Sequence, residues 1–227
     1  MTRNVITTWR RTRILRWAVL AVVVLCAWGP VSDRLRYDPP QVTGRGWTLD
    51  GGVQGLSMKA RSCETTYSDL GMLPLPDRTC TPGGTDPAVT QGNLDTTVCD
   101  PSGYTDKVRP PLKVSNAAKK VVMAAYGIPL DRMGDYKLDH LVPLSAGGSS
   151  SASNLWPQEK ILINGPASQY MQTEKDRVEI YLHRALCRGE VTLKEVQEEF
   201  PRDWSQAVTQ LGLTEIPYGW TGEAPGS

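Results

Sequence analysis

The pattern of apolar and polar residues predicts strands in one short part of the chain. Residues 136–142 alternate between apolar and polar side chains, which predicts a strand that ends at Pro143. Residues 155–156 predict a second extended piece, and Pro157 limits it. The ten residues between them, SAGGSSSASN at 145–154, have the composition of a loop. We therefore expect two short strands joined by a polar loop.

Apolar residues at helical spacing predict three helical segments around this pair of strands. The first two have natural end signals at glycine, and the third begins with a capping box. A proline is expected to interrupt the third segment before it resumes as far as Leu211. The residues that carry these signals are Ser115 and Gly127 for the first helix, Gln169, Cys187 and Gly189 for the second, and Thr192, Glu195 and Pro201 for the third.

The N-terminus carries a basic flank followed by an apolar run. Five arginines and no acid fall within residues 1–30, and the run at 17–28 is uninterrupted. This layout is typical of a secretory signal or an uncleaved signal-anchor helix, with a buried core helix as the alternative. We expect residues 1–31 to direct export, so that the rest lies outside the cytoplasm, either secreted or anchored to the membrane.

The remaining chain divides by composition. Residues 32–62 predict a linker, with a short strand around Trp47–Leu49, and residues 213–227 predict a flexible tail. Residues 63–113 are rich in turn residues and contain three cysteines, which predicts a loop-rich segment tied by a disulfide. The folded domain is expected to span residues 63–212.

Charge excludes one way of binding nucleic acid. The net charge is +1, but without the five N-terminal arginines 20 basic residues face 24 acidic ones. A protein that binds nucleic acid through bulk charge would be more basic, so any contact must come from a local patch. No acid occurs between residues 107 and 130, where Arg109 and Lys113 are candidate phosphate ligands, and Lys175 is another. The alternative is an ordinary solvated face.

The cysteines agree with export. Besides Cys26 there are four, at positions 63, 80, 99 and 187, and an even number in an exported chain favours two disulfides with three connectivities. A zinc site is disfavoured because no two cysteines are two to four residues apart.

Asp139 and His140 carry the candidate chemistry. Neighbouring side chains in a strand point to opposite faces, so the two cannot bind one ion in the same way. This favours a division of roles, in which the carboxylate of Asp139 binds a hard divalent cation and the imidazole of His140 acts as a base. The alternative is an ordinary hydrogen-bonded histidine.

The surrounding segment, YKLDHLVPLSAGGSSSASNLWPQ at 136–158, resembles the HNH endonuclease family. The resemblance extends over roughly 63–210, including the cysteine-bearing stretch at 80–111 and the helical region at 174–204, as in actinobacterial secreted HNH-like proteins. It implies that Asp139 is a metal ligand, His140 the general base, and Asn154 the middle residue that holds the hairpin and helps to orient the base. The implied fold is α+β, a ββα-metal hairpin and helix with flanking helices and a disulfide-tied N-terminal segment.

The chain departs from the family at the second metal ligand, which is usually a histidine or asparagine on the helix after the hairpin. Asn164 is the candidate that we assign, with Glu174 and Asp176 as alternatives. Such oxygen ligands suit Mg²⁺ or Mn²⁺. The resemblance of the 80–111 stretch also favours pairing Cys80 with Cys99 and Cys63 with Cys187. The competing Cys63–Cys80 bridge closes a loop of similar size, so entropy does not distinguish them.

The implied function is metal-dependent hydrolysis of phosphodiester bonds in DNA or RNA outside the cytoplasm. The expected partners are nucleic acid and, through the N-terminal segment, the membrane; no protein partner is predicted. The rival interpretation is an HNH-like envelope-anchored module that has lost a ligand and serves in binding or structure. The unfilled ligand position favours the rival, whereas Asp139, His140 and Asn154 together favour the enzyme.

Overall fold

The computed structural model describes residues 45–48, 52–68, 73–162, 172–214 and 216, all of which belong to one compact unit. The predicted signal or anchor at 1–31 and most of the predicted tail lie outside the described residues. Among the helices that the structure describes, none is both long and apolar enough to cross a membrane.

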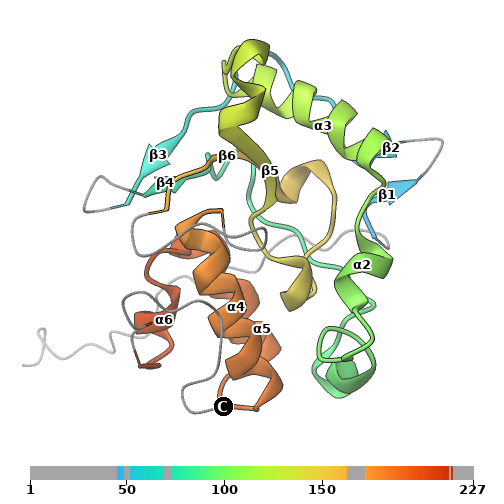
Figure 1. Ribbon diagram of the computed structural model, residues 1–227, viewed down its shortest axis with the longest axis vertical. Helices are drawn as coiled ribbons and strands as arrows, with labels where there is room; N and C mark the ends of the chain where they lie inside the picture. Colours follow the sequence, from blue (N-terminus) through green and yellow to red (C-terminus); the bar gives the residue numbers. More distant parts are fainter. Residues whose placement is uncertain (1–44, 49–51, 69–72, 163–171, 215, 217–227) are drawn as a thin grey trace, which may run out of the picture. The chain divides into compact units, whose positions relative to one another are not determined.

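The fold is mixed α+β, built from small hairpin sheets and short helices (Figure 1). Three antiparallel two-stranded sheets lie within the described ranges. Their strands are β1 (Trp47–Thr48) with β2 (Gly52–Val53), β3 (Thr66–Tyr67) with β4 (Pro74–Leu75), and β5 (Tyr136–His140) with β6 (Leu155–Glu159). The α-helices are α2 (Tyr104–Val108), α3 (Leu112–Ala125), α4 (Glu174–Cys187), α5 (Leu193–Asp203) and α6 (Ala207–Gln210).

The β5–β6 hairpin carries Asp139 and His140, the residues with the candidate chemistry. Its register places Asp139 opposite Trp156 and His140 opposite Leu155. The expectation that Pro157 would limit the second strand is wrong, because Pro157 lies inside β6 opposite Leu138. Both strands of a two-stranded sheet are edge strands, where a residue without an N–H is tolerated.

Helix α3 packs against both strands of this hairpin. It begins at Leu112, three residues before the predicted start, because Pro111 takes the N-cap position and its fixed φ suits a helix entry. Ser115 instead lies in the first turn, and its hydroxyl donates to the carbonyl of Pro110. Gly127 follows the helix with φ +69°, so the predicted stop signal is confirmed.

The C-terminal helices confirm one capping box and correct one break. Thr192 and Glu195 form the predicted box at the start of α5. The expectation that Pro201 interrupts this helix is wrong, because α5 continues through it to Asp203. A proline in the last turn costs one hydrogen bond near a helix end, where few backbone bonds remain to be broken.

A single core joins these elements. Trp156 of β6 is fully buried, as are Val122 of α3, Leu182 of α4 and Phe200 of α5. The core therefore holds the β5–β6 hairpin between α3 and the C-terminal helices, and the edges of that hairpin carry the polar groups described below.

The disulfides are Cys63–Cys80 and Cys99–Cys187, so the predicted pairing is wrong although all four cysteines are bonded. The first bridge joins positions 17 residues apart. The second fastens the end of α4 to the loop after Val98, whose carbonyl lies 2.7 Å from Nε2 of His183. That contact brings Cys99 to Cys187, a proximity that sequence separation does not reveal.

Candidate functional site

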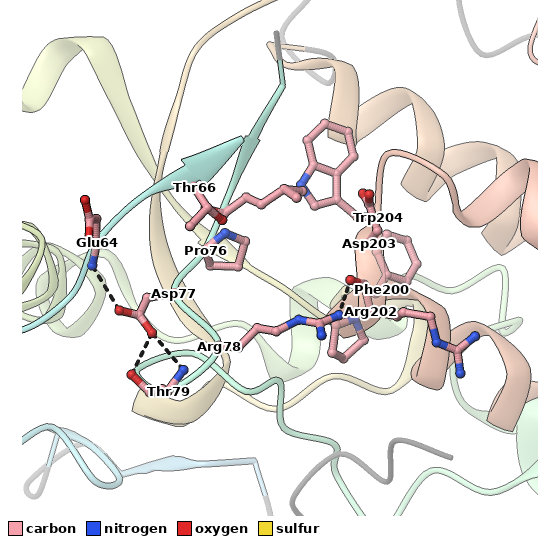
Figure 2. A pocket seen from close by; sticks show the side chains of 12 residues that line it. Glu64, Thr66, Pro76, Asp77, Arg78, Thr79, Phe200, Arg202, Asp203 and Trp204 are labelled. Atoms are coloured by element: carbon pink, nitrogen blue, oxygen red, sulfur yellow. Dashed lines mark hydrogen bonds between the residues drawn. The ribbon is translucent and has the colours of Figure 1, made fainter. Parts of the chain in front are cut away.

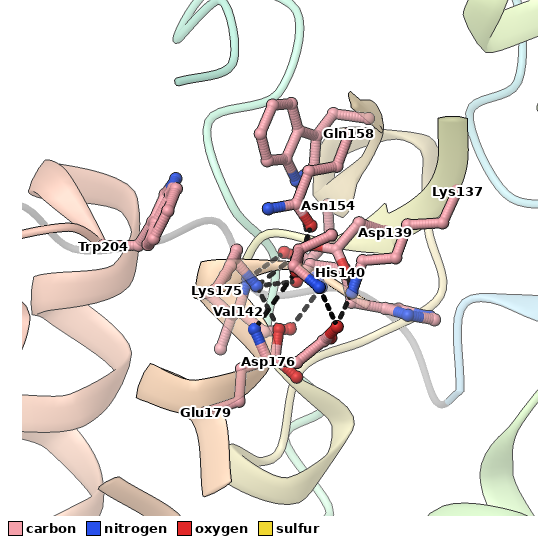
Figure 3. Close-up of polar contacts among 12 residues, drawn as sticks. Lys137, Asp139, His140, Val142, Asn154, Gln158, Lys175, Asp176, Glu179 and Trp204 are labelled. Atoms are coloured by element: carbon pink, nitrogen blue, oxygen red, sulfur yellow. Dashed lines mark hydrogen bonds and ion pairs between the residues drawn. The ribbon is translucent and has the colours of Figure 1, made fainter. Parts of the chain in front are cut away.

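Asp139 and His140 occupy the end of β5, and Figure 3 draws both side chains among the polar contacts around them. The Asp139 side chain contacts the first turn of α4, while the His140 ring contacts the loop between the strands. The structure therefore brings the predicted ligand and the predicted base together from one strand end, each with its own surroundings.

The Asp139 carboxylate is buried between two ammonium groups. Oδ1 lies 2.9 Å from Nζ of Lys137, Oδ2 lies 2.9 Å from Nζ of Lys175, and the indole Nε1 of Trp156 donates to Oδ2 at 3.1 Å. Burial alone would raise the pKa of this carboxyl, but the two lysines outweigh burial and hold that pKa well below its usual range. Asp139 is therefore ionised at neutral pH.

Lys175 is placed for a role other than the predicted one. Its side chain is 0% exposed, and Nζ donates to the carbonyl of His140 at 2.8 Å and to Glu179, besides pairing with Asp139. The ammonium also lies 5.0 Å from the centroid of the Phe200 ring. The expectation that Lys175 binds substrate phosphate is therefore wrong in this conformation, because protein acceptors take its protons.

Two further carboxylates join Asp139. One oxygen from each of Asp139, Asp176 and Glu179 lies within 4.8 Å of the others. Asp176 receives Lys137 on one oxygen and the backbone N–H groups of Gln172 and Thr173 on the other. Asp176 was an alternative ligand from the sequence, whereas Glu179 was missed; its only signal was its spacing of four residues from Lys175.

Glu179 holds its proton more tightly than an ordinary glutamate. Burial raises the pKa of its carboxyl to about 7; the Asp139 carboxylate adds to the rise, and the Lys175 ammonium opposes it. The three carboxylates and two lysines thus form a compact charged cluster, which we call the carboxylate–lysine cluster (Asp139, Asp176, Glu179, Lys137 and Lys175).

His140 is neutral. Its Nε2 lies 2.8 Å from the hydroxyl of Ser150, a buried residue of the polar loop that sequence reasoning did not identify. Burial lowers the pKa of the imidazole to about 3; the nearby Arg109 acts in the same direction, and Asp139 opposes it. An unprotonated imidazole can accept a proton, and the Ser150 contact leaves Nδ1 as the other ring nitrogen.

Asn154 fastens the loop that joins the two strands. Its Oδ1 accepts from the N–H groups of Gly84 and Val142, and its Nδ2 donates to the carbonyls of Val142 and Ser149. Among the described contacts Asn154 has none with the His140 ring. It holds the loop that carries Ser150, the hydrogen-bond partner of His140.

A groove opens beside His140. It encloses about 360 Å³, and its walls include Arg109, Lys137 and Lys160 together with the imidazole. Arg109 thus lies where the sequence placed a phosphate ligand, whereas Lys113 is exposed on α3 and does not line this groove. Lys160 was not identified from the sequence.

Of the other predicted ligands, Asn164 and Glu174, the structure describes Glu174. Asn164 falls outside the described residues. Glu174 lies 3.4 Å from Nε of Arg177 and is not part of the carboxylate–lysine cluster. His183 lies beside Cys99 and Cys187, but these two sulfurs are bonded to each other and so are not thiolate ligands.

A second depression, of about 280 Å³, lies between residues 64–79 and the end of α5 (Figure 2). Its polar groups are engaged with nearby backbone: Asp77 accepts from Thr79 and from the N–H of Glu64, and Arg78 donates to the carbonyl of Arg202. This depression lies where the segment closed by the Cys63–Cys80 bridge meets α5. Its lining residues include no histidine beside a cluster of carboxylates.

Comparison of the chain with protein-family models, with curated proteins and with solved structures finds no match. The functional assignment therefore rests on the geometry of the site.

Proposed function

We propose that this protein is a divalent-metal-dependent endonuclease that hydrolyses phosphodiester bonds of nucleic acid, DNA in the first place, outside the cytoplasm. The observation that carries the proposal is the surroundings of His140. This neutral, partly buried histidine ends a strand, lines a basic groove, and is adjacent in sequence to the ionised carboxylate of Asp139. The order of hairpin and helix supports a ββα-metal core, with β5, β6 and α4 as its parts.

The donor set fits a hard cation. Asp139, Asp176 and Glu179 each offer one carboxylate oxygen, and these three oxygens lie within 4.8 Å of one another. Carboxylate oxygens are the ligands that Mg²⁺ and Mn²⁺ prefer. Lys137 and Lys175 now neutralise these oxygens, so metal binding requires that an ammonium group be displaced. When bound, the ion would supply positive charge to the scissile phosphate and to the leaving oxygen.

The residues of the chain supply the proton transfer and the positioning. His140 is the residue that we assign to take a proton from the attacking water at a ring nitrogen. Its imidazole is unprotonated at neutral pH, but the burial that lowers its pKa to about 3 also weakens it as a base. Ser150 holds Nε2, so the ring cannot rotate freely and Nδ1 is the nitrogen that we assign as the base. Arg109 provides a cation in the same groove for the phosphate.

One observation favours a second candidate, an HNH-like binding module without catalytic activity. The two oxygens of Asp139 already have one lysine each, and Lys175 is fully buried. In such a module the lysines would take the place of the ion permanently, and the basic groove would bind nucleic acid without cleaving it.

A plasmid-nicking assay of the full chain distinguishes the two. We expect nicking with Mg²⁺ or Mn²⁺ and none with EDTA. The variants Asp176→Asn and Glu179→Gln should raise the metal concentration needed for half-maximal nicking, with Glu190→Gln, an exposed glutamate, as the matched control. No cleavage of the plasmid or of a single-stranded oligonucleotide with any divalent metal would favour the binding module. Nicking that EDTA leaves unchanged would refute the metal-dependent mechanism.

A further inference from the structure

The groove beside His140 combines positive charge with apolar area. Four basic residues line it, and among its lining residues there is no aspartate or glutamate: the basic four are Arg109, Lys119, Lys137 and Lys160. A surface of this sign and shape favours a ligand with phosphate groups.

Two of these cations are engaged by the protein and two are available. Nζ of Lys119 donates to the carbonyls of Met133 and Tyr136, each at 2.7 Å, and Lys137 belongs to the carboxylate–lysine cluster. Arg109 and Lys160 are exposed, and neither forms an ion pair with any residue in the described ranges. Their charge is therefore uncompensated within the groove.

The pKa of the neighbouring Lys119 reflects the uncompensated charge of Lys160. Burial lowers the pKa of Lys119, and the charge of Lys160 lowers it further. Lys119 and Lys160 thus lie close enough within the groove for their charges to interact.

The groove also has an apolar part. Pro110, Leu112, Leu138 and Leu155 line it, and Leu112 is 75% exposed, which makes it one of few large apolar side chains that the described surface leaves open. A duplex presents phosphates and sugars outward and keeps its base faces stacked inside. An unpaired strand can turn a base or sugar face onto such a wall while its phosphates meet the cations.

We propose that this groove binds single-stranded nucleic acid in preference to duplex, with phosphates at Arg109 and Lys160 and an unstacked nucleotide against Leu112. The inference rests on the proposed function and names its substrate class. Anionic lipid also attracts cations beside apolar residues, but a membrane surface is flat, whereas this site is a concave groove with His140 in its wall. The concave shape favours a single chain.

Fluorescence anisotropy of the full chain in EDTA tests this proposal, because binding is then read without cleavage. The probes are a labelled 12-nucleotide single strand and the duplex of the same sequence. We expect tighter binding of the single strand. Arg109→Gln and Lys160→Gln should each weaken it and reduce the slope of log affinity against log salt by about 0.7, the value for one lost phosphate contact on a single strand.

Leu112→Ser should weaken single-strand binding about fourfold, the equivalent of one buried methylene group, and leave duplex binding unchanged. Lys113→Gln is the matched control, since Lys113 is exposed on the same helix but does not line the groove. It should bind as the parent does.

Several results would overturn the proposal: duplex bound as tightly as the single strand, no binding of either probe, or Lys113→Gln as damaging as Lys160→Gln. So would a parallel loss of binding to phosphatidylserine vesicles in the Arg109 and Lys160 variants, which would assign the groove to lipid. Nicking activity is read separately. Single-strand binding without cleavage of either the plasmid or a single-stranded oligonucleotide in Mg²⁺ or Mn²⁺ would refute the nuclease and keep the groove, whereas cleavage with duplex preference would refute only the groove.

Discussion

At the scale of single residues, the site is built on charges that are costly to bury unless each has a partner. Lys175 is fully buried and depends on Asp139, Glu179 and the carbonyl of His140 for its contacts. Removing one partner of a buried ion pair destabilises far more than the pair itself stabilises. The same contacts tie Asp139, His140 and α4 into one unit, so we expect substitutions in this network to affect folding as well as the proposed chemistry.

Asp139→Ala should therefore lose metal-dependent activity and also destabilise the fold, by about 3 kcal/mol, because it removes one of the two carboxylates that face the buried Lys175 ammonium. Urea denaturation followed by tryptophan fluorescence measures the loss. The double variant Asp139→Ala with Lys175→Met should recover part of the stability and none of the activity. A single variant as stable as the parent would show that Lys175 does not depend on Asp139.

Asn154 has a structural role, because its side chain holds the backbone of the loop between β5 and β6. Asn154→Ala leaves four backbone groups without their partners in a buried loop and should destabilise by about 4 kcal/mol, at roughly 1 kcal/mol for each lost bond. Asn116→Ala, an exposed change on α3, is the control and should remain within about 0.5 kcal/mol of the parent. Equal stability of the two variants would contradict the fastening role.

At the scale of elements, each disulfide ties a segment with little core of its own to a helix or loop that has one. Cys63–Cys80 joins positions 17 residues apart, and Cys99–Cys187 joins the loop after Val98 to the end of α4 across 88 residues. The backbone N–H of Cys63 also donates to the carbonyl of Ala125 at the end of α3, so the segment closed by Cys63–Cys80 is held against this helix. One bridge thereby holds its segment near α3, and the other holds a loop at the end of α4, on the two helices beside the β5–β6 hairpin.

Replacing each bridge by serines should reveal their unequal loop sizes. The chain-entropy estimate gives about 3 kcal/mol for the shorter loop and about 4.5 kcal/mol for the longer one, so loss of Cys99–Cys187 should lower the urea midpoint more. Non-reducing peptide mapping checks the pairing first. A Cys80–Cys99 peptide would contradict the structure, and a greater loss from the Cys63–Cys80 variant would contradict the ranking.

The elements show which parts of this fold local sequence signals determine. The alternation at 136–142, the glycine after α3 and the Thr192–Glu195 box each depend on neighbours in the chain, and each predicted element is present. The disulfide pairing depends on contacts between distant segments, and the two candidate loops around Cys80 had nearly equal entropy. Pro157 and Pro201 were misjudged because an edge strand and a last helical turn tolerate a missing N–H.

The candidate site divides in the same way. Asp139 and His140 were identifiable because they are adjacent and end a strand. Ser150 was one serine among several in a polar loop, and only the fold brings it to the imidazole. Lys175 was taken for a surface cation because lysine is almost never fully buried, and its burial follows from the packing of α4 against the hairpin.

At the scale of the whole molecule, a small α+β unit fixed by two disulfides presents one strand end to two environments. The carboxylate–lysine cluster is one of them, and the basic groove with His140 is the other; Lys137 belongs to both. The central claim is that these neighbouring environments act together in the cleavage of a phosphodiester bond, with His140 as the base.

Single-turnover cleavage by His140→Ala, compared with the parent, tests this claim most directly. We measure rate constants on plasmid DNA and on a single-stranded oligonucleotide with Mg²⁺ or Mn²⁺, and binding by anisotropy in EDTA. His183→Gln, a change of the other histidine in the chain, is the control. The account predicts a loss of about 10²- to 10⁴-fold for His140→Ala with binding nearly unchanged, and near-parental rates for the control. Cleavage by His140→Ala at close to the parental rate, or no metal-dependent cleavage by the parent on either substrate, would contradict it.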